Sequence, residues 1–271
     1  MADDTIHAGG SSAPEDDDAS AEELLARLRH AVRAKERFLN AIVHDLKSPL
    51  TSIKGYAQLA ERRLDQQQHE GVRQALQVID RQITRMNRML QGSLDAVRLE
   101  AGVTELRHSR FDLHDLLTDV IETARARNTH RLECRGFEGS AQGHWDRERL
   151  EVAMRNVVDN ALSYSAPGTL VLITLARVEA PPAEGGGDAQ VEVAVRDEGI
   201  GIPADDLERI FEQFYRSGGA LGVDGMGLGL YVARGIVSLH HGLIWAESEG
   251  ESAGSTFHLR LPLDKAARSA A

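Results

Sequence analysis

The chain has 271 residues, and its 42 acidic residues against 31 Lys and Arg give a formal net charge of −11. This length predicts one or two domains. The acidic balance argues against a protein that binds nucleic acid or anionic membranes, because such surfaces are normally basic. No stretch approaches the ~18 apolar residues of a membrane span, and the start of the chain does not have the pattern of a secretory signal. The single cysteine, Cys134, excludes an intrachain disulfide framework. We therefore expect a cytoplasmic protein.

The first residues combine glycine, serine and proline with an acidic run at residues 15–18. They have too few apolar side chains to offset the entropy cost of ordering, so we expect a disordered acidic tail over residues 1–19. Ser20 precedes Glu23 by three residues, which is typical of a capping box and predicts that a helix begins there.

Two long apolar repeats follow, with steps that alternate between three and four residues, as in helices that pack along one seam. The first repeat contains Leu25, Leu28, Val32, Lys35, Leu39, Ile42, Leu46, Pro49, Ile53, Tyr56 and Ala60, and the second contains Val72, Leu76, Ile79, Ile83, Met86, Leu90, Leu94 and Val97. The polar stretch 66–71 between them predicts a turn, and hence an antiparallel helical hairpin over residues 20–105. Pro49 should kink the first helix locally. One hairpin cannot bury both stripes but two can, so we expect a homodimeric four-helix bundle.

From about residue 106 the pattern becomes mixed. Helical patterns near residues 112–126, 147–164, 204–211 and 228–240 alternate with β-rich runs at 132–137, 170–178, 191–196, 243–247 and 256–261. This alternation predicts an α/β domain over residues 106–263, with helices packed on one sheet. The proline- and glycine-rich segment 181–187 predicts a hairpin loop, and residues 264–271 form a C-terminal tail. The expected fold class is therefore α+β with two domains.

The first chemical motif is a histidine on the hairpin. With Leu39 and Leu46 at heptad position a, His44 falls at position f and should point away from the seam. An exposed neutral imidazole can act as a nucleophile. Asp45 can orient the ring or accept its proton, and Ser48, one turn later, shares the same face. In isolation, such a pair is more often an ordinary solvated helix face.

Two glycine-rich strings are further candidates for a binding site. The first follows a predicted strand, and the second opens a predicted helix. Asp197 ends a strand, and Gly199 and Gly201 after it allow a flat ligand to approach the backbone, where the carboxylate would favour the amine of adenine. The second string alternates glycine with other residues, at Gly225, Gly227 and Gly229, and continues with Leu230. Glycines at a helix N-terminus favour a bound phosphate, although the spacing fits neither Walker nor dinucleotide-binding patterns. Taken alone, such strings are also common as turns and hinges.

Two further segments complete the candidate site. Asn156 and Asn160 lie one turn apart on a predicted helix that ends at Tyr164. Their amide oxygens and the carboxylate of the neighbouring Asp159 are hard oxygen ligands that suit Mg²⁺ bound to a nucleotide phosphate, and Asn160 is the expected metal ligand. Phe211 and Phe214 should pack, and we expect them to anchor a mobile lid from which Arg216 reaches phosphate. The simpler alternatives are a polar helix stripe and ordinary core phenylalanines.

The order of these motifs resembles the transmitter core of bacterial sensor histidine kinases, over roughly residues 31–263. His44 and Asp45 look like the family's phosphoacceptor box, and the other segments look like its Asn, first glycine, phenylalanine and second glycine boxes. Gly254-Ser255-Thr256-Phe257 resembles the segment before its last strand. The resemblance implies a gyrase-type ATP-binding domain, with ATP and Mg²⁺ as cofactors and a homodimeric hairpin. It also implies a response-regulator receiver domain as partner.

Two positions depart from that family. A basic residue usually lies three positions after the second asparagine, but here the position is Ser163. The position four after the histidine is usually Thr or Asn, and here it is Ser48, which keeps a hydroxyl. The resemblance implies a histidine kinase that phosphorylates His44 and can also dephosphorylate its regulator. The alternatives are a dimeric phosphotransfer scaffold with a degraded site and a gyrase-type ATPase without phosphohistidine. No sensor domain is visible in the sequence, so we expect it to be separate or missing.

Overall fold

The computed structural model describes residues 15–65, 68–126, 129–136, 140–179, 189–218 and 226–263. The chain divides into two compact units, Met1–Gln82 and Ile83–Ala271, each of which is described by itself. Most of the expected N-terminal tail, the loop at 181–187, Gly225 and the tail at 264–271 lie outside the described residues.

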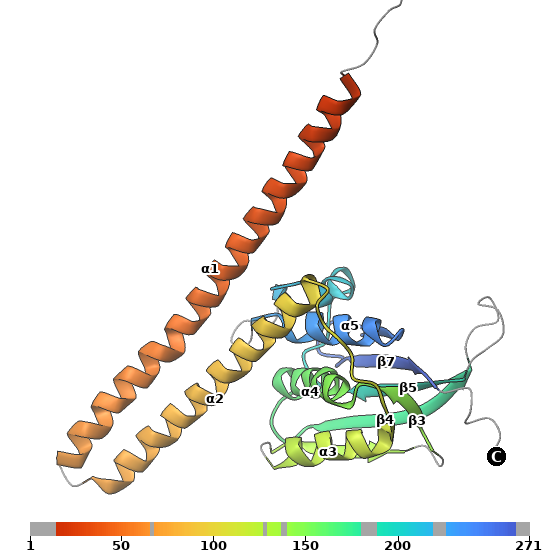
Figure 1. Cartoon of the computed structure of the whole chain (residues 1–271). Coiled ribbons are helices and arrows are strands. Elements are labelled where there is room, and N and C mark those ends of the chain that lie inside the picture. The colour runs from red at the N-terminus through yellow and green to blue at the C-terminus, as the bar shows by residue number, and fades with distance from the viewer. Residues whose placement is uncertain are drawn as a thin grey trace, which may run out of the picture. The chain divides into compact units, whose positions relative to one another are not determined.

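The N-terminal part of the chain forms two long helices, α1 (Glu15–Asp65) and α2 (His69–Glu100), as the two apolar repeats predict (Figure 1). The helix begins at Glu15, so the capping prediction at Ser20 is wrong and residues 15–19 belong to the helix. Acidic residues at a helix N-terminus interact favourably with the helix dipole, which explains the earlier start. The helix continues through Pro49 as one element. At the hairpin turn, Arg63 Nη1 donates to the Gly71 carbonyl at 3.1 Å.

The C-terminal part contains two sheets. The larger has the strand order β2-β4-β5-β7-β6, with β2 parallel to β4 and the other pairs antiparallel. Its strands are β2 (Arg131–Arg135), β4 (Leu170–Glu179), β5 (Ala189–Arg196), β6 (Leu243–Glu247) and β7 (Thr256–Pro262). All five expected strands are confirmed within a few residues. The smaller sheet pairs β1 (Ser109–Asp112) with β3 (Gln142–Trp145), and the sequence did not predict it because four residues are too few for a clear alternation.

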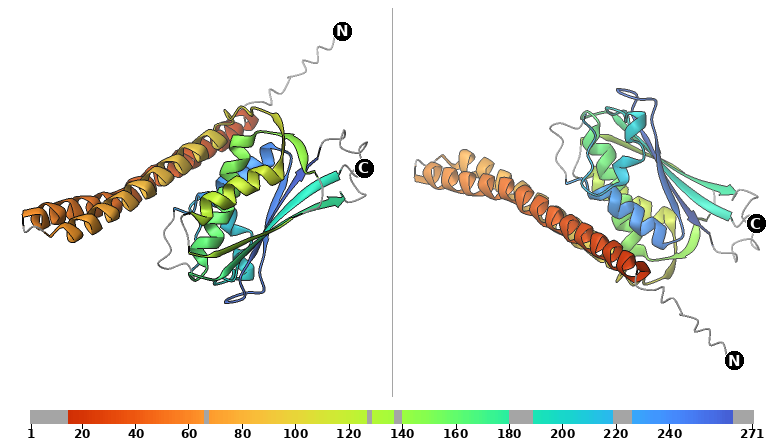
Figure 2. Two further views of the ribbon diagram at one scale, coloured as in Figure 1. Left: turned by 90° about the horizontal axis from the view of Figure 1, so that it is seen from below. Right: turned by 90° about the horizontal axis from the view of Figure 1, so that it is seen from above.

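Three helices cover one face of the larger sheet, as Figure 2 shows. They are α3 (Leu113–Arg125), α4 (Arg147–Tyr164) and α5 (Gly229–Leu239). Alternate residues of β5 and β7, such as Val193 and Leu259, are fully buried beneath helix residues such as Val157 and Ile236. The expected α/β sandwich is thus confirmed. Its other face carries polar groups, among them Glu192, whose carboxylate accepts from Arg260 Nη2 at 2.7 Å.

The helix expected over residues 204–211 is instead two short 3₁₀ turns, η2 (Ala204–Asp206) and η3 (Arg209–Phe211). Eight residues make a marginal α-helix, because nucleation costs more than so few hydrogen bonds return. Short 3₁₀ turns close the same stretch with fewer ordered residues. None of the helices in the described part of the chain is long and apolar enough to cross a membrane.

Candidate functional site: a nucleotide-sized cavity and an exposed histidine

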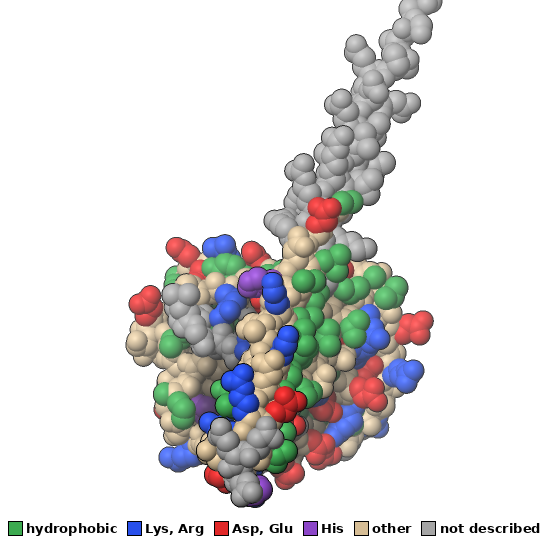
Figure 3. Space-filling model, turned by 90° about the vertical axis from the view of Figure 1, so that its left-hand side faces the viewer, with side chains coloured by type: hydrophobic (Ala, Val, Ile, Leu, Met, Phe, Trp, Pro, Cys, Tyr) green, Lys and Arg blue, Asp and Glu red, His purple; other side chains and the backbone are tan. Residues whose placement is uncertain are grey.

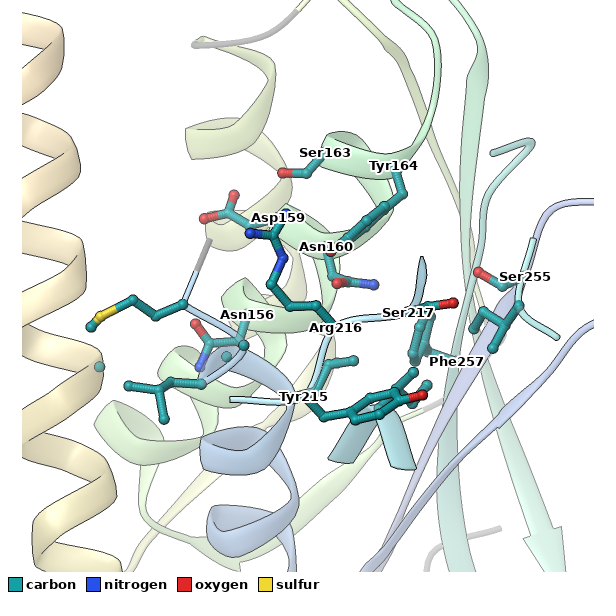
Figure 4. Close-up of a pocket in the computed structure, with 18 of the residues that line it drawn as sticks. Asn156, Asp159, Asn160, Ser163, Tyr164, Tyr215, Arg216, Ser217, Ser255 and Phe257 are labelled. Atoms are coloured by element: carbon teal, nitrogen blue, oxygen red, sulfur yellow. The ribbon is translucent and has the colours of Figure 1, made fainter. Parts of the chain in front are cut away.

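The Ile83–Ala271 unit contains a cavity of about 580 Å³, a size that suits a small-molecule ligand. Its walls come from α2, α4, the segment after β5, the 3₁₀ region and the start of α5. Among the expected nucleotide-binding residues, those on the cavity wall are Asn156, Asn160, Tyr164, Asp197, Gly201, Arg216, Gly227, Gly229 and Leu230 (Figure 4). The fold therefore brings together segments that are up to 74 positions apart in the sequence, from Asn156 to Leu230.

Asp197 is the buried carboxylate of this cavity. It follows β5, and its side chain is only 3% exposed. Its Oδ1 accepts from the Gly199 backbone N–H at 2.8 Å, and its Oδ2 accepts from the Ser255 hydroxyl at 2.5 Å. Burial raises the pKa of Asp197, and these hydrogen bonds partly oppose the rise. The carboxylate is held in one orientation and can accept a hydrogen bond from a ligand amine.

The glycines at positions 199 and 201 are required by backbone packing. A Cβ on Gly199 would lie 2.5 Å from the Tyr164 carbonyl oxygen, and Gly199 is not on the cavity wall formed by the described residues. Gly201 has a φ of +72°, and a Cβ there would lie 1.8 Å from the Gly250 carbonyl oxygen. Only glycine fits these positions, because the backbone after β5 passes directly against other backbone.

Helix α4 presents a polar face to the cavity. The carboxylate of Asp146 caps its start by accepting from the Arg149 backbone N–H at 3.0 Å. One side of the helix is buried in the core, whereas Asn156, Asn160 and Tyr164 recur every four residues along the wall. Figure 4 shows these side chains along one line of the cavity. This wall offers amide oxygens and a phenol to a bound ligand.

These amide oxygens fit a Mg²⁺ ion that takes most of its ligands from water and from a bound substrate. The described residues contain no group of three or more His, Cys, Asp or Glu side chains that could hold a metal ion. A Mg²⁺ ion that takes one oxygen from Asn160 must complete its octahedral shell with water and substrate oxygens. Mg²⁺ normally binds in this way when it accompanies a nucleotide phosphate.

The start of α5 closes another side of the cavity. Gly229 and Leu230 lie at its N-terminus, where free backbone N–H groups and the helix dipole favour an anion. Gly227 has a φ of +68°, and a Cβ there would lie 2.6 Å from the Tyr215 carbonyl oxygen. The Phe214 N–H donates to the Gly227 carbonyl at 3.1 Å, so the second glycine string and the phenylalanine segment hold each other.

The two phenylalanines are not on the described cavity wall. Phe211 is 5% exposed and packs edge-to-face on Phe257, with 6.5 Å between ring centroids. Neither Phe211 nor Phe214 is part of the wall that the described residues form, so their expected nucleotide contact is not seen, whereas the expected packing is seen for Phe211. Tyr215 and Arg216, the next two residues, do line it. The hydroxyl of Tyr215 donates to Asp206 at 2.5 Å, which fixes the start of the expected lid.

Several wall residues were not predicted from the sequence. Arg85, Arg88, Met89 and Gly92 come from α2, and no motif around them indicates a ligand. Ser255, the partner of Asp197, lies within the segment that resembles the family's last motif, so the sequence did carry a signal for it. Asp159 and Ser163, which the sequence had already indicated, also line the cavity on the same helix as the two asparagines.

The histidine on α1 belongs to the Met1–Gln82 unit. The side chain of His44 is 87% exposed, which confirms its assignment to the outward heptad position. Its Nδ1 lies 3.0 Å from Oδ1 of Asp45. Ser48 is also exposed and follows one turn later. The unit thus displays an accessible imidazole whose orientation is set by a neighbouring carboxylate.

Two family models match the chain. Residues 34–102 match the His Kinase A (phospho-acceptor) domain, and residues 145–265 match the histidine kinase-, DNA gyrase B- and HSP90-like ATPase. The signal transduction histidine-protein kinase AfsQ2 of Streptomyces coelicolor is 28% identical over 253 residues, which are 90% of this chain and 44% of AfsQ2. The adaptive-response sensory kinase SasA of a Synechococcus species is 33% identical over 250 residues, which are 88% of this chain and 62% of SasA.

A solved structure of full-length ShkA in complex with AMPPNP shares the fold, with a TM-score of 0.55 and 24% identity, over 84% of this chain and 45% of ShkA. The chain spans about half the length of the curated relatives described above. The two family models together match well over half of the chain, in the order that the sequence motifs predict. The chain belongs to the two-component sensor histidine kinases and contains their transmitter core.

Proposed function

We propose that this chain is an ATP-dependent protein histidine kinase that phosphorylates its own His44 and passes the phosphoryl group to an aspartate of a response-regulator receiver domain. The observation that carries the proposal is the combination of the exposed His44–Asp45 pair with a cavity that holds Asn160 and Asp197 on its wall. The presence of AMPPNP in the related ShkA structure supports ATP as the nucleotide.

In this proposal the adenine amine donates to Asp197, since this buried carboxylate can only accept. The phosphates lie between Asn160 and the N-terminus of α5, where backbone N–H groups favour negative charge. Asn160 holds Mg²⁺, which neutralises charge on the phosphates when it is bound. Arg216 adds a charge-assisted donor, and in Figure 4 its side chain extends along the cavity toward Asp159.

The geometry at His44 assigns a role to each ring nitrogen. The carboxylate of Asp45 beside Nδ1 favours the tautomer with the proton on Nδ1, which leaves the lone pair on Nε2. The Nε2 lone pair forms the new bond to the γ-phosphorus, and the bond from that phosphorus to the β–γ bridging oxygen breaks, so ADP leaves with the electron pair. Asp45 accepts the Nδ1 proton and removes the positive charge from the phosphorylated ring.

The hairpin helices support a homodimer. On α1, Leu39 and Leu50 are large apolar side chains that are 50% and 52% exposed. On α2, Leu94 is 52% exposed. Figure 3 shows hydrophobic side chains gathered along the described part of these helices. Apolar patches of this kind on a soluble protein commonly mark an interface. A second copy of the hairpin, which would complete a four-helix bundle, is the proposed cover.

Two alternative functions make different predictions. A phosphotransfer scaffold with a degraded site would not need the ordered hydrogen bonds around Asp197, yet the structure has them. A gyrase-type ATPase without phosphohistidine would not need an exposed imidazole that a carboxylate orients, yet His44 and Asp45 form that pair. Both features therefore favour the kinase.

The test is incubation of the full chain with ATP labelled at the γ-phosphate. We expect protein label that is stable in base and labile in acid, and we expect His44→Gln to abolish it while the fold persists, because position 44 is exposed. His69→Gln, at another exposed helix position, is the matched control and should keep the label. ATP hydrolysis without protein label would indicate the ATPase, and absence of ATP binding would indicate the scaffold.

A further inference from the structure

Helix α2 contributes a face to the nucleotide cavity. Arg85, Arg88, Met89 and Gly92 follow the helical spacing of three, four and seven residues, and all four line the cavity. A Cβ on Gly92 would meet nothing within 4 Å, so this face of the helix borders open space. All four residues belong to the same unit as the rest of the cavity wall.

Named contacts fix this part of α2 against the cavity. The Asp95 carboxylate lies 2.9 Å from Arg149 Nη1 on α4, and Asp95 is only 2% exposed. The Ser93 hydroxyl lies 4.0 Å from the Met226 sulfur, next to the second glycine string. These contacts come one to three turns after Arg85 and Arg88 on the same helix, so they hold both arginines at the cavity.

The charges on the cavity wall favour an anionic ligand. The described wall residues carry three arginines, Arg85, Arg88 and Arg216, against the two aspartates Asp159 and Asp197. Asp197 already accepts hydrogen bonds from Ser255 and Gly199, at the end assigned to the adenine. This excess of positive charge occurs in a chain whose formal net charge is −11, so it is a local feature of the cavity.

The cavity is also lined by a neutral residue one turn after Asn160. Ser163 lies on α4 and lines the cavity together with Arg85 and Arg88. Figure 4 shows Ser163 beside Asp159 and Tyr164 on this wall. A hydroxyl there offers a hydrogen bond but no charge to a phosphate.

We propose that Arg85 and Arg88 of α2 bind the phosphates of ATP and supply the positive charge that Ser163 does not provide. The proposal rests on the proposed ATP site. A guanidinium group donates two parallel hydrogen bonds to phosphate oxygens and stays charged at every physiological pH. Nucleotide affinity in this protein therefore depends on α2 as well as on the ATPase-like domain.

The test compares three ligands on the full chain by calorimetry: ATP, ADP and adenosine. We expect the double variant Arg85→Ala/Arg88→Ala to lose about tenfold or more in ATP affinity, because each charge-assisted bond is stronger than a neutral one. The loss should be smaller for ADP and absent for adenosine, which has no phosphate. Arg98→Ala is the matched control on the same helix: Arg98 is exposed and outside the described cavity wall, so affinity should not change.

A rescue variant separates a charge effect from a structural one. Ser163→Lys, added to the double variant, should restore most of the ATP affinity by placing a cation on the α4 side of the same cavity. Unchanged ATP affinity in the double variant, equal losses for ATP and adenosine, or a lack of rescue would each overturn the proposal. If wild-type protein binds ATP and the double variant binds it with the same affinity, only this inference fails. If wild-type protein binds neither ATP nor adenosine, the proposed function fails with it.

Discussion

Asp95 of α2 and Arg149 of α4 form an ion pair, with 2.9 Å between Oδ1 and Nη1. The two partners differ in exposure: the Asp95 side chain is 2% exposed and the Arg149 side chain 23%. Asp95 also accepts from Gln91 Nε2 at 3.2 Å. The pair joins α2 to the helix that carries Asn156 and Asn160, so it links the position of α2 to the nucleotide wall.

The unequal exposure predicts unequal costs of substitution. Arg149→Met leaves a buried carboxylate without its cation, and we expect a loss of about 3 kcal/mol in the free energy of unfolding. Asp95→Asn leaves an arginine that water can reach, so its cost should be clearly smaller. Urea unfolding measures both. Arg155→Met is the control, because Arg155 and Glu151 form an exposed pair whose loss should cost less than about 1 kcal/mol. Equal costs for Arg149→Met and Asp95→Asn would contradict the assignment.

Asp197→Asn should lower ATP affinity at least tenfold while the protein stays folded. The substitution replaces an acceptor with a carboxamide and weakens a charge-assisted hydrogen bond worth roughly 1.5–3 kcal/mol. Ser255→Ala should have a smaller effect of the same sign, since it removes only the hydroxyl that orients Oδ2. Calorimetry with ATP gives both values. ATP binding that is unchanged in Asp197→Asn would place the adenine elsewhere.

Asn160→Ala should raise the magnesium concentration needed for phosphorylation of His44. The amide oxygen of Asn160 is the proposed protein ligand of Mg²⁺, so its removal leaves only water and phosphate oxygens. The measurement is a magnesium titration of the labelling rate. Ser163→Ala, one turn later on the same wall, is the control and should keep the wild-type magnesium dependence. A magnesium titration of Asn160→Ala identical to that of the wild type would show that Asn160 is not the ligand.

Ser48→Ala should lose phosphatase activity toward a phosphorylated regulator and keep phosphorylation of His44. Ser48 is exposed one turn after His44, where its hydroxyl can position a water molecule. Ser48→Thr should keep or raise the activity, because the β-methyl group restricts the rotamers of the hydroxyl. The assay follows the decay of phosphorylated regulator with ADP present. Equal decay with wild type and Ser48→Ala would show that Ser48 has no part in this reaction.

We expect the folded protein to lose stability in mild acid because of the buried side chain of His240. It is 2% exposed; its Nε2 accepts from the Asp146 N–H at 3.0 Å, and its Nδ1 lies 2.8 Å from the Ile236 carbonyl. Burial lowers the pKa of His240 below its ordinary value of 6.5, and the charged or titratable neighbours are Asp146, His108 and His241. The neutral ring uses both nitrogens, whereas protonation of Nε2 would remove the acceptor.

The direction in which stability changes with pH follows from this lowered pKa of His240. Below pH 6.5 the unfolded chain binds a proton at His240 that the folded chain excludes, so this contribution to stability is full above pH 6.5 and falls as the pH drops. Its slope can reach about 1.4 kcal/mol per pH unit. Urea unfolding at several pH values should show a steeper loss in wild type than in His240→Gln. His241→Gln, at the exposed neighbouring position, should keep the wild-type slope.

Much of the architecture could be predicted because it depends on local periodicity. The two apolar repeats predicted α1 and α2, and the predicted helix over residues 147–164 coincides with α4. The start of α1 was wrong because a short acidic segment can extend a helix that already exists. The strands β1 and β3 were missed because each is stabilised by its partner across the small sheet rather than by its own pattern.

The sequence by itself determined the chemical groups and the exposure of the acceptor. The heptad position of His44 and the motifs around Asn160 and Asp197 are properties of neighbouring residues, and they were sufficient to indicate the family. Only the tertiary structure decided which groups share the cavity. It brought Arg85 and Arg88 to the cavity that Ser163 also lines, placed the Ser255 hydroxyl on Asp197 and left Phe211, packed on Phe257, outside the described cavity wall. These relationships depend on packing between elements far apart in the chain, which no local pattern encodes.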